Sequence, residues 1–288
     1  MNRNRPALGI ALMLATTFVF AIQDGISKHL ATAYGVVLIV MIRYWFFAVF
    51  VVAISTRQPG GLRQVARSRL YFWQALRGVL LVAEIVVMVT AFTRLGLVES
   101  QTIFATYPLL VAALSGPVLG ESVGWRRWVA IAVGFCGLLL ILRPTAGVFA
   151  LDALIPLLSA AMFALYQLLT RYVSRQDGAG TSFFWTGIAG ALAITAFGFG
   201  DLRPLAGFDW VWMTALGVTG ALGHYLLIKA LEAAEAAVVQ PFAYFQMIFA
   251  SIVGVLVFGE VIDFWTAVGA AVIMLAGIFT IVRGAKAG

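Results

Sequence analysis

The chain has 288 residues, of which 62% are hydrophobic and only 11% are charged, and its mean hydropathy is +1.01. Soluble domains carry about 25% charged residues, so this composition excludes a water-soluble enzyme or binding domain. The formal net charge of +7 would suit a nucleic-acid partner, but the distribution of the positive residues described below argues against one. The single cysteine, Cys136, excludes an intrachain disulfide.

Apolar segments follow one another along almost the whole chain, and each is long enough to cross a bilayer, which takes about 20 residues in a helix. The first, although basic residues precede it, is followed by Asp24 and Lys28 instead of a small-residue cleavage site, so we interpret it as a retained helix. The sequence therefore predicts an all-α integral membrane protein with one transmembrane domain, residues 1–288. The ten predicted helices are 7–30, 34–55, 71–95, 98–119, 125–142, 150–173, 180–199, 208–231, 236–258 and 263–283.

Short similarities link the two halves of the chain. The Gly-Glu pair at 120–121 returns at 259–260, and the Phe-Ala pair at 20–21 returns at 163–164. Each half, 7–143 and 150–283, contains five predicted helices. Because five is odd, the second repeat must insert in the opposite orientation to the first. Inverted repeats around a site near the bilayer midplane are typical of alternating-access transporters.

The positive residues indicate the topology. If the N-terminus is cytoplasmic, only Lys28, Arg94, Arg143 and Arg203 fall on the outer side, and Arg43 and Arg77 fall within helices. The positive-inside rule then places both termini in the cytoplasm. Thirteen positive residues fall on the inner side: Arg3, Arg5, Arg57, Arg63, Arg67, Arg69, Arg126, Arg127, Arg171, Arg175, Lys229, Arg283 and Lys286.

Three features carry a resemblance to a known family: Arg43, the run Leu97–Glu121 with its internal Pro108, and its echo Ala236–Glu260. With these features the chain resembles, over essentially its whole length, the EamA-type ten-helix exporters of the drug/metabolite transporter superfamily. Within that family it is most similar to the YddG-type exporters of aromatic and other amino acids. The resemblance implies export of amino acids or related small metabolites across the bacterial inner membrane.

Other functions stay open at this point. An exporter of other metabolites or drugs, or a nucleotide-sugar-type exchanger, would share the same architecture. An integral-membrane enzyme acting on lipid is the alternative from another class, but the sequence has no catalytic cluster. It also has no P-loop and no metal-ligand motif, so we expect neither ATP nor a cofactor nor a bound metal. We expect a monomer or a weak homodimer in the lipid bilayer, with no nucleic-acid partner.

Two titratable residues lie at related depths in the two halves. Glu84 is near the middle of the third predicted helix, and His224 lies 140 positions later in the eighth. Ionisable residues inside a membrane are costly and usually functional, so we expect this pair to bind a zwitterionic substrate or a proton. The alternative is a structural hydrogen-bonded pair, or a Glu84 that is satisfied by hydroxyls such as those of Thr90 and Tyr107.

Four further charged residues are candidates for gating or structure. Asp24 and Lys28 are one helical turn apart, so we expect them to pair, with substrate contact by Asp24 as the alternative. Lys28 and Arg171 are expected to reach opposite membrane faces. Arg43 lies deep in its helix and needs acceptors. It resembles the arginine found at this point in the family, which implies a gating role, with carboxylate binding as the alternative. Arg77, near a helix start, is expected to be interfacial.

Pro108 and Pro241 interrupt helices at related positions of the two halves, and each removes a backbone donor. Two broken helices of this kind are a pointer to a transport site, although a packing kink is the alternative. Glu121 and Glu260 are expected to cap the helices that follow them. The further substrate-binding candidates are Tyr107, Trp185, Tyr225, Gln240, Tyr244 and Gln246.

Overall fold

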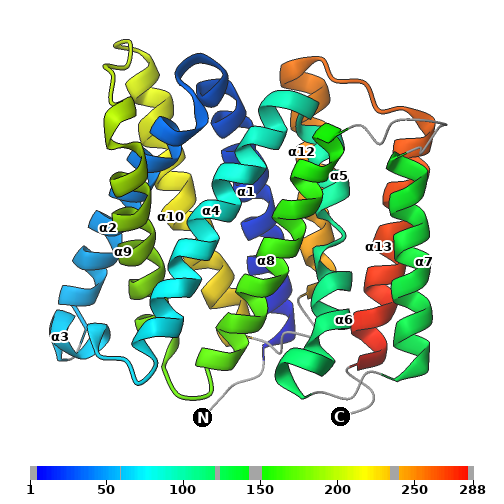
Figure 1. Cartoon of the computed structure of the whole chain (residues 1–288), viewed down its shortest axis with the longest axis horizontal. Coiled ribbons are helices and arrows are strands. Elements are labelled where there is room, and N and C mark those ends of the chain that lie inside the picture. The colour runs from blue at the N-terminus through cyan, green and yellow to red at the C-terminus, as the bar shows by residue number, and fades with distance from the viewer. Residues whose placement is uncertain (1–4, 59, 121–123, 143–150, 234–239, 285–288) are drawn as a thin grey trace.

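The computed structural model describes residues 5–58, 60–120, 124–142, 151–233 and 240–284, and all secondary structure within these ranges is helical. Figure 1 shows long helices that run up and down side by side between an upper and a lower edge. The helix that opens the bundle begins, and the one that closes it ends, at the same lower edge.

The elements follow the chain in this order. The first half contains α1 (Pro6–Tyr34), α2 (Val36–Thr56), α3 (Gly61–Ala66), α4 (Tyr71–Leu95), α5 (Leu97–Phe104), α6 (Tyr107–Leu119) and α7 (Trp125–Leu142). The second half contains η1 (Leu151–Ala153), α8 (Leu154–Val173), α9 (Ala179–Gly198), η2 (Phe199–Asp201), α10 (Asp209–Ala233), η3 (Gln240–Tyr244), α12 (Phe245–Phe258) and α13 (Phe264–Gly284), where η denotes a 3₁₀ turn.

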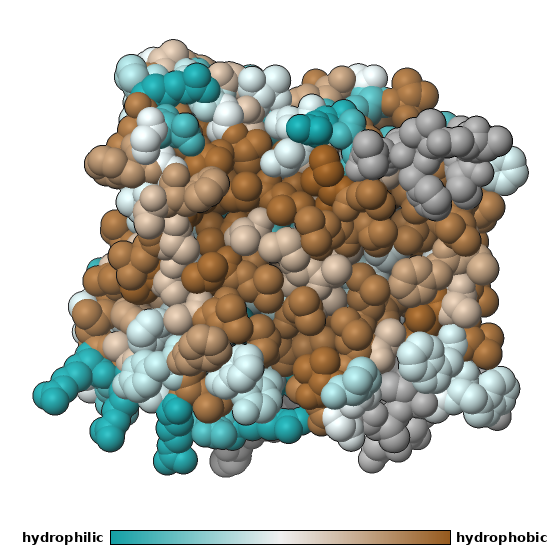
Figure 2. Space-filling model, viewed as in Figure 1, coloured by the Kyte–Doolittle hydropathy of each residue, from teal (hydrophilic) through white to brown (hydrophobic). Residues whose placement is uncertain are grey.

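Helices of this length and apolarity make the chain a multi-pass membrane protein. In the described residues, six segments are long and apolar enough to span a bilayer: Pro6–Tyr34, Val36–Thr56, Tyr71–Leu95, Leu97–Leu119, Leu154–Val173 and Ala179–Asp201. Shorter apolar helices are Trp128–Leu142, Phe242–Phe258 and Phe264–Phe279. Figure 2 shows a broad hydrophobic band between edges where hydrophilic residues gather. The count of ten spans in inverted repeats stays a prediction.

The structure differs from the expected helices in two places of the first half. The basic stretch between α2 and α4, which none of the predicted helices covered, contains the short helix α3. The helix expected over 98–119 is interrupted at Ala105 and Thr106, so that α5 ends at Phe104 and α6 begins at Tyr107. The interruption lies directly before Pro108, which has no backbone N–H to donate to the preceding turn.

The corresponding segment of the second half is also irregular. The helix expected over 236–258 begins only at Phe245 as an α-helix, after the 3₁₀ turn Gln240–Tyr244. Residues 234–239 lie outside the described part of the chain. The turn contains Pro241, so in both halves a proline accompanies the departure from regular α-helix.

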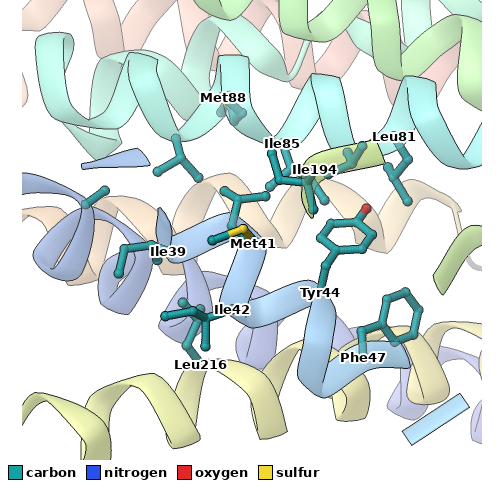
Figure 3. Packing of buried hydrophobic residues seen from close by; sticks show 14 of the residues in the cluster. Ile39, Met41, Ile42, Tyr44, Phe47, Leu81, Ile85, Met88, Ile194 and Leu216 are labelled. Carbon is teal, nitrogen blue, oxygen red and sulfur yellow. The ribbon is translucent and has the colours of Figure 1, made fainter. Parts of the chain in front are cut away.

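The main apolar core lies where α2, α4, α9 and α10 meet. Figure 3 shows Met41 and Tyr44 of α2 beside Ile85 of α4 and Ile194 of α9. Glycines allow the close approach of these helices: a Cβ on Gly190 of α9 would lie 2.3 Å from the Tyr44 ring. The core therefore depends on ring-against-backbone packing, which a single added methyl group would disturb.

Helices α7 and α13 form a closely packed pair at one side of the bundle (Figure 1). They cross at Gly137 and Gly269, where a Cβ built on Gly269 would lie 2.6 Å from the carbonyl oxygen of Gly137. Small residues at such a crossing let two membrane helices approach backbone to backbone. The last helix of each half thus contacts its counterpart.

Candidate functional site

A cavity of about 520 Å³ lies inside the bundle, between α1, α2, α4, α5, α8, α9, α10 and α12. At one end it reaches Asp177 and Gly178 in the loop between α8 and α9, at the lower edge of Figure 1. At the other end it reaches Phe92 near the end of α4 and Gln101 of α5. Its volume lies in the range of about 300–1,000 Å³ that is typical of small-molecule sites.

Aromatic side chains form two walls of this cavity. In one, the Tyr107 ring lies 5.1 Å from that of Phe104 and 4.8 Å, edge to face, from that of Phe163. In the other, the imidazole of His224 stacks on Phe47 at 5.5 Å and meets the ring of Phe20 edge-on at 5.2 Å. Rings that face a cavity in this way offer apolar contact area to a planar ligand.

Asp24 of α1 joins the two interrupted helices. Its Oδ2 atom accepts a hydrogen bond of 2.7 Å from Nε2 of Gln101, on α5, and one of 3.0 Å from Nε2 of Gln246, on α12. Asp24 is 8% exposed and lines the cavity. The expected Asp24–Lys28 pair is wrong, because the Asp24 carboxylate faces the bundle interior, whereas Lys28 pairs with another helix end.

Lys28 forms an ion pair with Glu260, in the loop between α12 and α13. The same carboxylate accepts 2.8 Å hydrogen bonds from the backbone N–H groups of Leu97 and Val98, the first residues of α5. The expectation that Glu260 caps the following helix is therefore wrong: it caps α5, where the backbone donors of a helix start are unsatisfied. Glu121 lies outside the described residues.

Glycines make room for this contact. A Cβ on Gly96 would lie 2.8 Å, and one on Gly254 2.9 Å, from carboxylate oxygens of Glu260. Gly96 also has a φ of +91°, which L-residues with side chains rarely adopt. Burial raises the pKa of Glu260, but the hydrogen bonds from Lys28 and the α5 backbone outweigh it, so the pKa is lowered overall. We call Lys28, Glu260 and the first turn of α5 the latch. It lies at the edge opposite the start of α1 and the end of α13 (Figure 1).

Glu84 and His224 both line the cavity, as their shared depth suggested, but they do not form a hydrogen-bonded pair. Glu84 is 4% exposed, and its Oε1 atom accepts a 2.6 Å hydrogen bond from the Ser159 hydroxyl of α8. The hydroxyls of Thr90 and Tyr107, expected as alternatives, are not its partners. His224 is held by the rings of Phe20 and Phe47 instead.

The two intramembrane arginines have opposite surroundings. Arg77 was expected at the interface, and this is wrong: it is 2% exposed and donates to Tyr166 and Thr170 at 3.2 Å, to Gln74 at 3.1 Å and to the Ser182 carbonyl. Arg43 is 7% exposed and lines the cavity. No described residue forms a hydrogen bond or an ion pair with it.

A polar network borders the cavity at the lower edge. Asp177 accepts hydrogen bonds from the Ser68 hydroxyl, from the Arg69 backbone N–H at 3.0 Å and from Gln74 Nε2 at 3.0 Å. Burial raises the pKa of Asp177, but these hydrogen bonds outweigh it and lower the pKa overall. Because Gln74 also accepts from Arg77, the network ties the start of α4 to the loop before α9.

Several candidates do not reach the cavity. Trp185 donates its Nε1 hydrogen to the Ala66 carbonyl at 3.0 Å, and Tyr225 is 42% exposed. Tyr244 is buried against α13, and with Pro108 it lines a separate void of about 20 Å³. Arg171 is exposed at the end of α8. The side chains of Gln240 and Pro241 lie outside the described part of the structure.

Sequence reasoning missed three residues that the structure places at the cavity or beside it: Gln101, Ser159 and Phe163. Gln101 and Ser159 are single polar residues in apolar runs, so their polarity alone could have identified them as candidates. Phe163 appeared only as the repeat counterpart of Phe20, which also lines the cavity, and it was not marked as a site residue because phenylalanine is common throughout the chain. In the described residues, no group of three or more His, Cys, Asp or Glu side chains could hold a metal ion.

Comparison with known proteins gives this cavity a context. The chain matches the EamA-like transporter family over residues 7–143 and again over residues 151–283. It is 30% identical to a riboflavin transporter of Vibrio cholerae, across 96% of this chain and 94% of that protein. It is 24% identical to an S-adenosylmethionine uptake transporter of Rickettsia prowazekii, across 95% of this chain and 92% of that protein.

A solved crystal structure shares the fold, with a TM-score of 0.65 at 15% sequence identity, across 99% of this chain and all of that one. Family and relatives point to transport rather than to enzymatic catalysis. The apolar helices and the internal cavity fit the same assignment. The chain belongs to the EamA-like transporter family of the drug/metabolite transporter superfamily, and it is a multi-pass membrane transporter of small metabolites.

Proposed function

We propose that this protein moves small, ring-bearing metabolites with polar groups across the bacterial inner membrane by alternating access. The observation that carries the proposal is the cavity itself, in which aromatic walls surround the charged groups of Asp24, Arg43 and Glu84. Apolar walls with a few convergent polar groups are the usual design of a small-molecule site. Charges at this depth of a membrane protein are retained where they serve transport.

The proposed architecture is ten spans in two inverted repeats, 7–143 and 150–283, within one transmembrane domain. Three observations support it. The family match occurs twice, over nearly the same two ranges. Each half has an interrupted segment, α5–α6 and η3–α12, and both contact Asp24 through a glutamine. The helices that close the halves, α7 and α13, pack on one another.

The proposed orientation puts both termini in the cytoplasm, as the distribution of Lys and Arg indicates. The cavity then reaches the cytoplasmic edge at Asp177 and Gly178, while the latch joins α1, α5 and the α12–α13 loop at the outer edge. This is the arrangement of an inward-facing state. Transport would require the latch to open as the cytoplasmic end closes.

Two substrate groups are consistent with the site. The named relatives favour a metabolite with a fused ring system, such as riboflavin or S-adenosylmethionine, since similarity covers nearly the whole length of each. Aromatic amino acids are the second candidate, favoured by one observation: the cavity offers both carboxylates and a guanidinium, which a zwitterion needs. The relatives' names do not decide between export and uptake, so direction is part of the test.

Counterflow into proteoliposomes tests this function. Vesicles preloaded with unlabelled riboflavin, S-adenosylmethionine or tryptophan would be diluted into a trace of the same labelled compound. We expect saturable accumulation of at least one compound, and we expect Phe163→Ala to weaken it because one aromatic wall is lost. Phe197→Ala is the matched control, since Phe197 is 79% exposed and outside the cavity. Uptake equal to that of empty vesicles for all three compounds would contradict the proposed substrate class.

A further inference from the structure

Arg43 is a buried guanidinium without a partner. It is 7% exposed, and no described residue donates to it, accepts from it or places a carboxylate oxygen within 4.0 Å of it. Arg77, on the neighbouring α4, is equally buried but is held by four protein groups. The bundle therefore gives the terminal nitrogens of Arg77 four hydrogen bonds, although its Nε atom has no partner, and it gives Arg43 none.

The unpaired guanidinium of Arg43 faces the cavity. None of its nitrogen atoms is among the enclosed polar atoms that lack a hydrogen bond, so the guanidinium nitrogens reach open space, and Arg43 lines the cavity. Its stem lies against α10 at Gly220, where a Cβ would come within 3.4 Å of its Nε atom. The stacked rings of Phe47 and His224 line the same part of the cavity.

Two carboxylates flank this guanidinium without touching it. Asp24 and Glu84 line the same cavity as Arg43, but neither places a carboxylate oxygen within 4.0 Å of its guanidinium. Each uses only one of its oxygens within the protein: Oδ2 of Asp24 and Oε1 of Glu84 accept the hydrogen bonds described above. The second oxygen of each carboxylate stays available to a ligand between the three groups.

A guanidinium without protein acceptors is costly inside a membrane protein, because its five N–H donors can be satisfied only by water or by a ligand in the cavity. A ligand that displaces this water must therefore supply the acceptors itself. The planar fork of arginine matches a carboxylate, or two neighbouring carbonyl oxygens, better than any other side chain does. The free donors of Arg43 therefore indicate the group that a ligand would present to it: a carboxylate or two neighbouring carbonyl oxygens.

We propose that Arg43 is a specificity-determining residue that binds an acceptor group of the substrate, while the free oxygens of Asp24 or Glu84 bind a donor group of the same molecule. This inference rests on the proposed function and narrows its substrate class. The substrate carries, next to its ring, both an acceptor for arginine and an N–H or ammonium donor. Purely apolar aromatic compounds and simple cations without an acceptor are excluded as good substrates.

The first test needs no substrate. Arg43→Met and Arg77→Met are matched replacements of two buried arginines by an apolar side chain of similar length. In the purified, detergent-solubilised protein we expect Arg43→Met to keep or raise the Tm, because it removes an unpaired charge. We expect Arg77→Met to lower the Tm by several degrees, because four hydrogen bonds are lost. If both variants lower the Tm equally, Arg43 is structural and the inference is overturned.

The second test uses ligand-induced stabilisation. Riboflavin, which offers ring carbonyls, and tryptophan, which offers a carboxylate, would each be added to the wild type, to Arg43→Met and to Arg94→Gln, a control on an exposed pair. We expect the compound that raises the Tm of the wild type to lose at least tenfold in affinity for Arg43→Met only. Tryptamine has the ring and the ammonium group of tryptophan but no carboxylate. If tryptophan binds through its carboxylate, tryptamine should not raise the Tm. Retained affinity in Arg43→Met overturns the inference, whereas failure of all compounds with the wild type counts against the proposed function alone.

Discussion

Asp24 accepts a hydrogen bond from Gln246, a residue 222 positions later in the chain, at 3.0 Å. The same oxygen accepts from Gln101, so one carboxylate of α1 connects the segments at which α5–α6 and η3–α12 depart from regular helix. Through this shared hydrogen-bond acceptor, a change at the cavity can be transmitted to both interrupted helices. Asp24 also lies one turn from Lys28, which together with Glu260 holds the start of α5.

The hydrogen bonds that Asp24 accepts can be tested separately from its negative charge. Asp24→Asn keeps an oxygen that accepts from the two glutamines, whereas Asp24→Ala leaves both amides without a partner. Because an unsatisfied buried group costs about 1–3 kcal/mol, we expect the alanine variant to have the lower Tm, and the asparagine variant to fold like the wild type. Thermal unfolding in detergent measures this. Equal Tm values for the two variants would show that the glutamines do not depend on this acceptor.

The latch should control access from the outer side. We expect Lys28→Gln to weaken the closed outer end by about 1.5 kcal/mol or more, since a charge-assisted hydrogen bond is lost. The reactivity of a cysteine at Met88, which lines the cavity on the C-terminal half of α4, would report this in a Cys136→Ala background. A membrane-impermeant maleimide added outside should label it roughly tenfold faster. Arg94→Gln, which breaks an exposed pair, should leave the rate unchanged.

The latch should also respond to acid. The pKa of Glu260 is lowered in the folded protein by Lys28 and by the backbone donors of α5. A lowered pKa contributes stability that is fully present above the ordinary value of 4.5 and is lost as the pH falls through the folded value. We therefore expect outer labelling of the Met88→Cys protein, divided by the labelling of the same cysteine in unfolded protein at the same pH so that thiol ionisation cancels, to be constant above about pH 5 and to rise below pH 4.5. Glu260→Gln should remove that rise; its persistence in this variant would assign the titration elsewhere.

The topology can be tested with two exposed positions. Gln58 follows α2 at the lower edge of the bundle, and Phe208, which is 71% exposed, precedes α10 at the upper edge. In the Cys136→Ala background we expect an impermeant maleimide to label a cysteine at 208 from outside intact cells. A cysteine at 58 should react only after the membrane is opened. Labelling of both from one side would contradict the cytoplasmic placement of both termini.

The role of Glu84 can be tested by removing its charge while keeping the shape of its side chain. Glu84→Gln keeps an oxygen that accepts from Ser159, so we expect normal folding but weaker substrate binding, because the free carboxylate oxygen is replaced. Ser159→Ala is the control: it removes the hydrogen bond but keeps the charge, and should affect stability more than affinity. Transport kinetics and Tm, measured together, separate these effects. Normal KM for Glu84→Gln would return Glu84 to a structural role.

Much of the fold is determined by local properties of the sequence. Long apolar runs must be helical in a membrane, because no water is present to satisfy the backbone. The observed α4 has its expected bounds, and those of α2 lie within two residues of the expected ones. The interruption before Pro108 follows from a missing donor, which is also local. Glu84, His224, Asp24 and Arg43 stood out because charge in an apolar run is costly wherever it occurs, and all four line the cavity.

The partners of these residues were decided only by the tertiary structure. Nothing near Lys28 in the sequence indicates Glu260, which lies 232 positions away, and the plausible neighbour Asp24 faces another direction. Arg43 and Arg77 are both arginines in apolar runs and both line the cavity, yet packing gives Arg77 four hydrogen-bond acceptors and Arg43 none. The sequence alone determined which side chains need a partner, because desolvation depends on the local run. Only the packing of the helices determined which partner each one has, because contacts between distant segments depend on how the whole bundle closes.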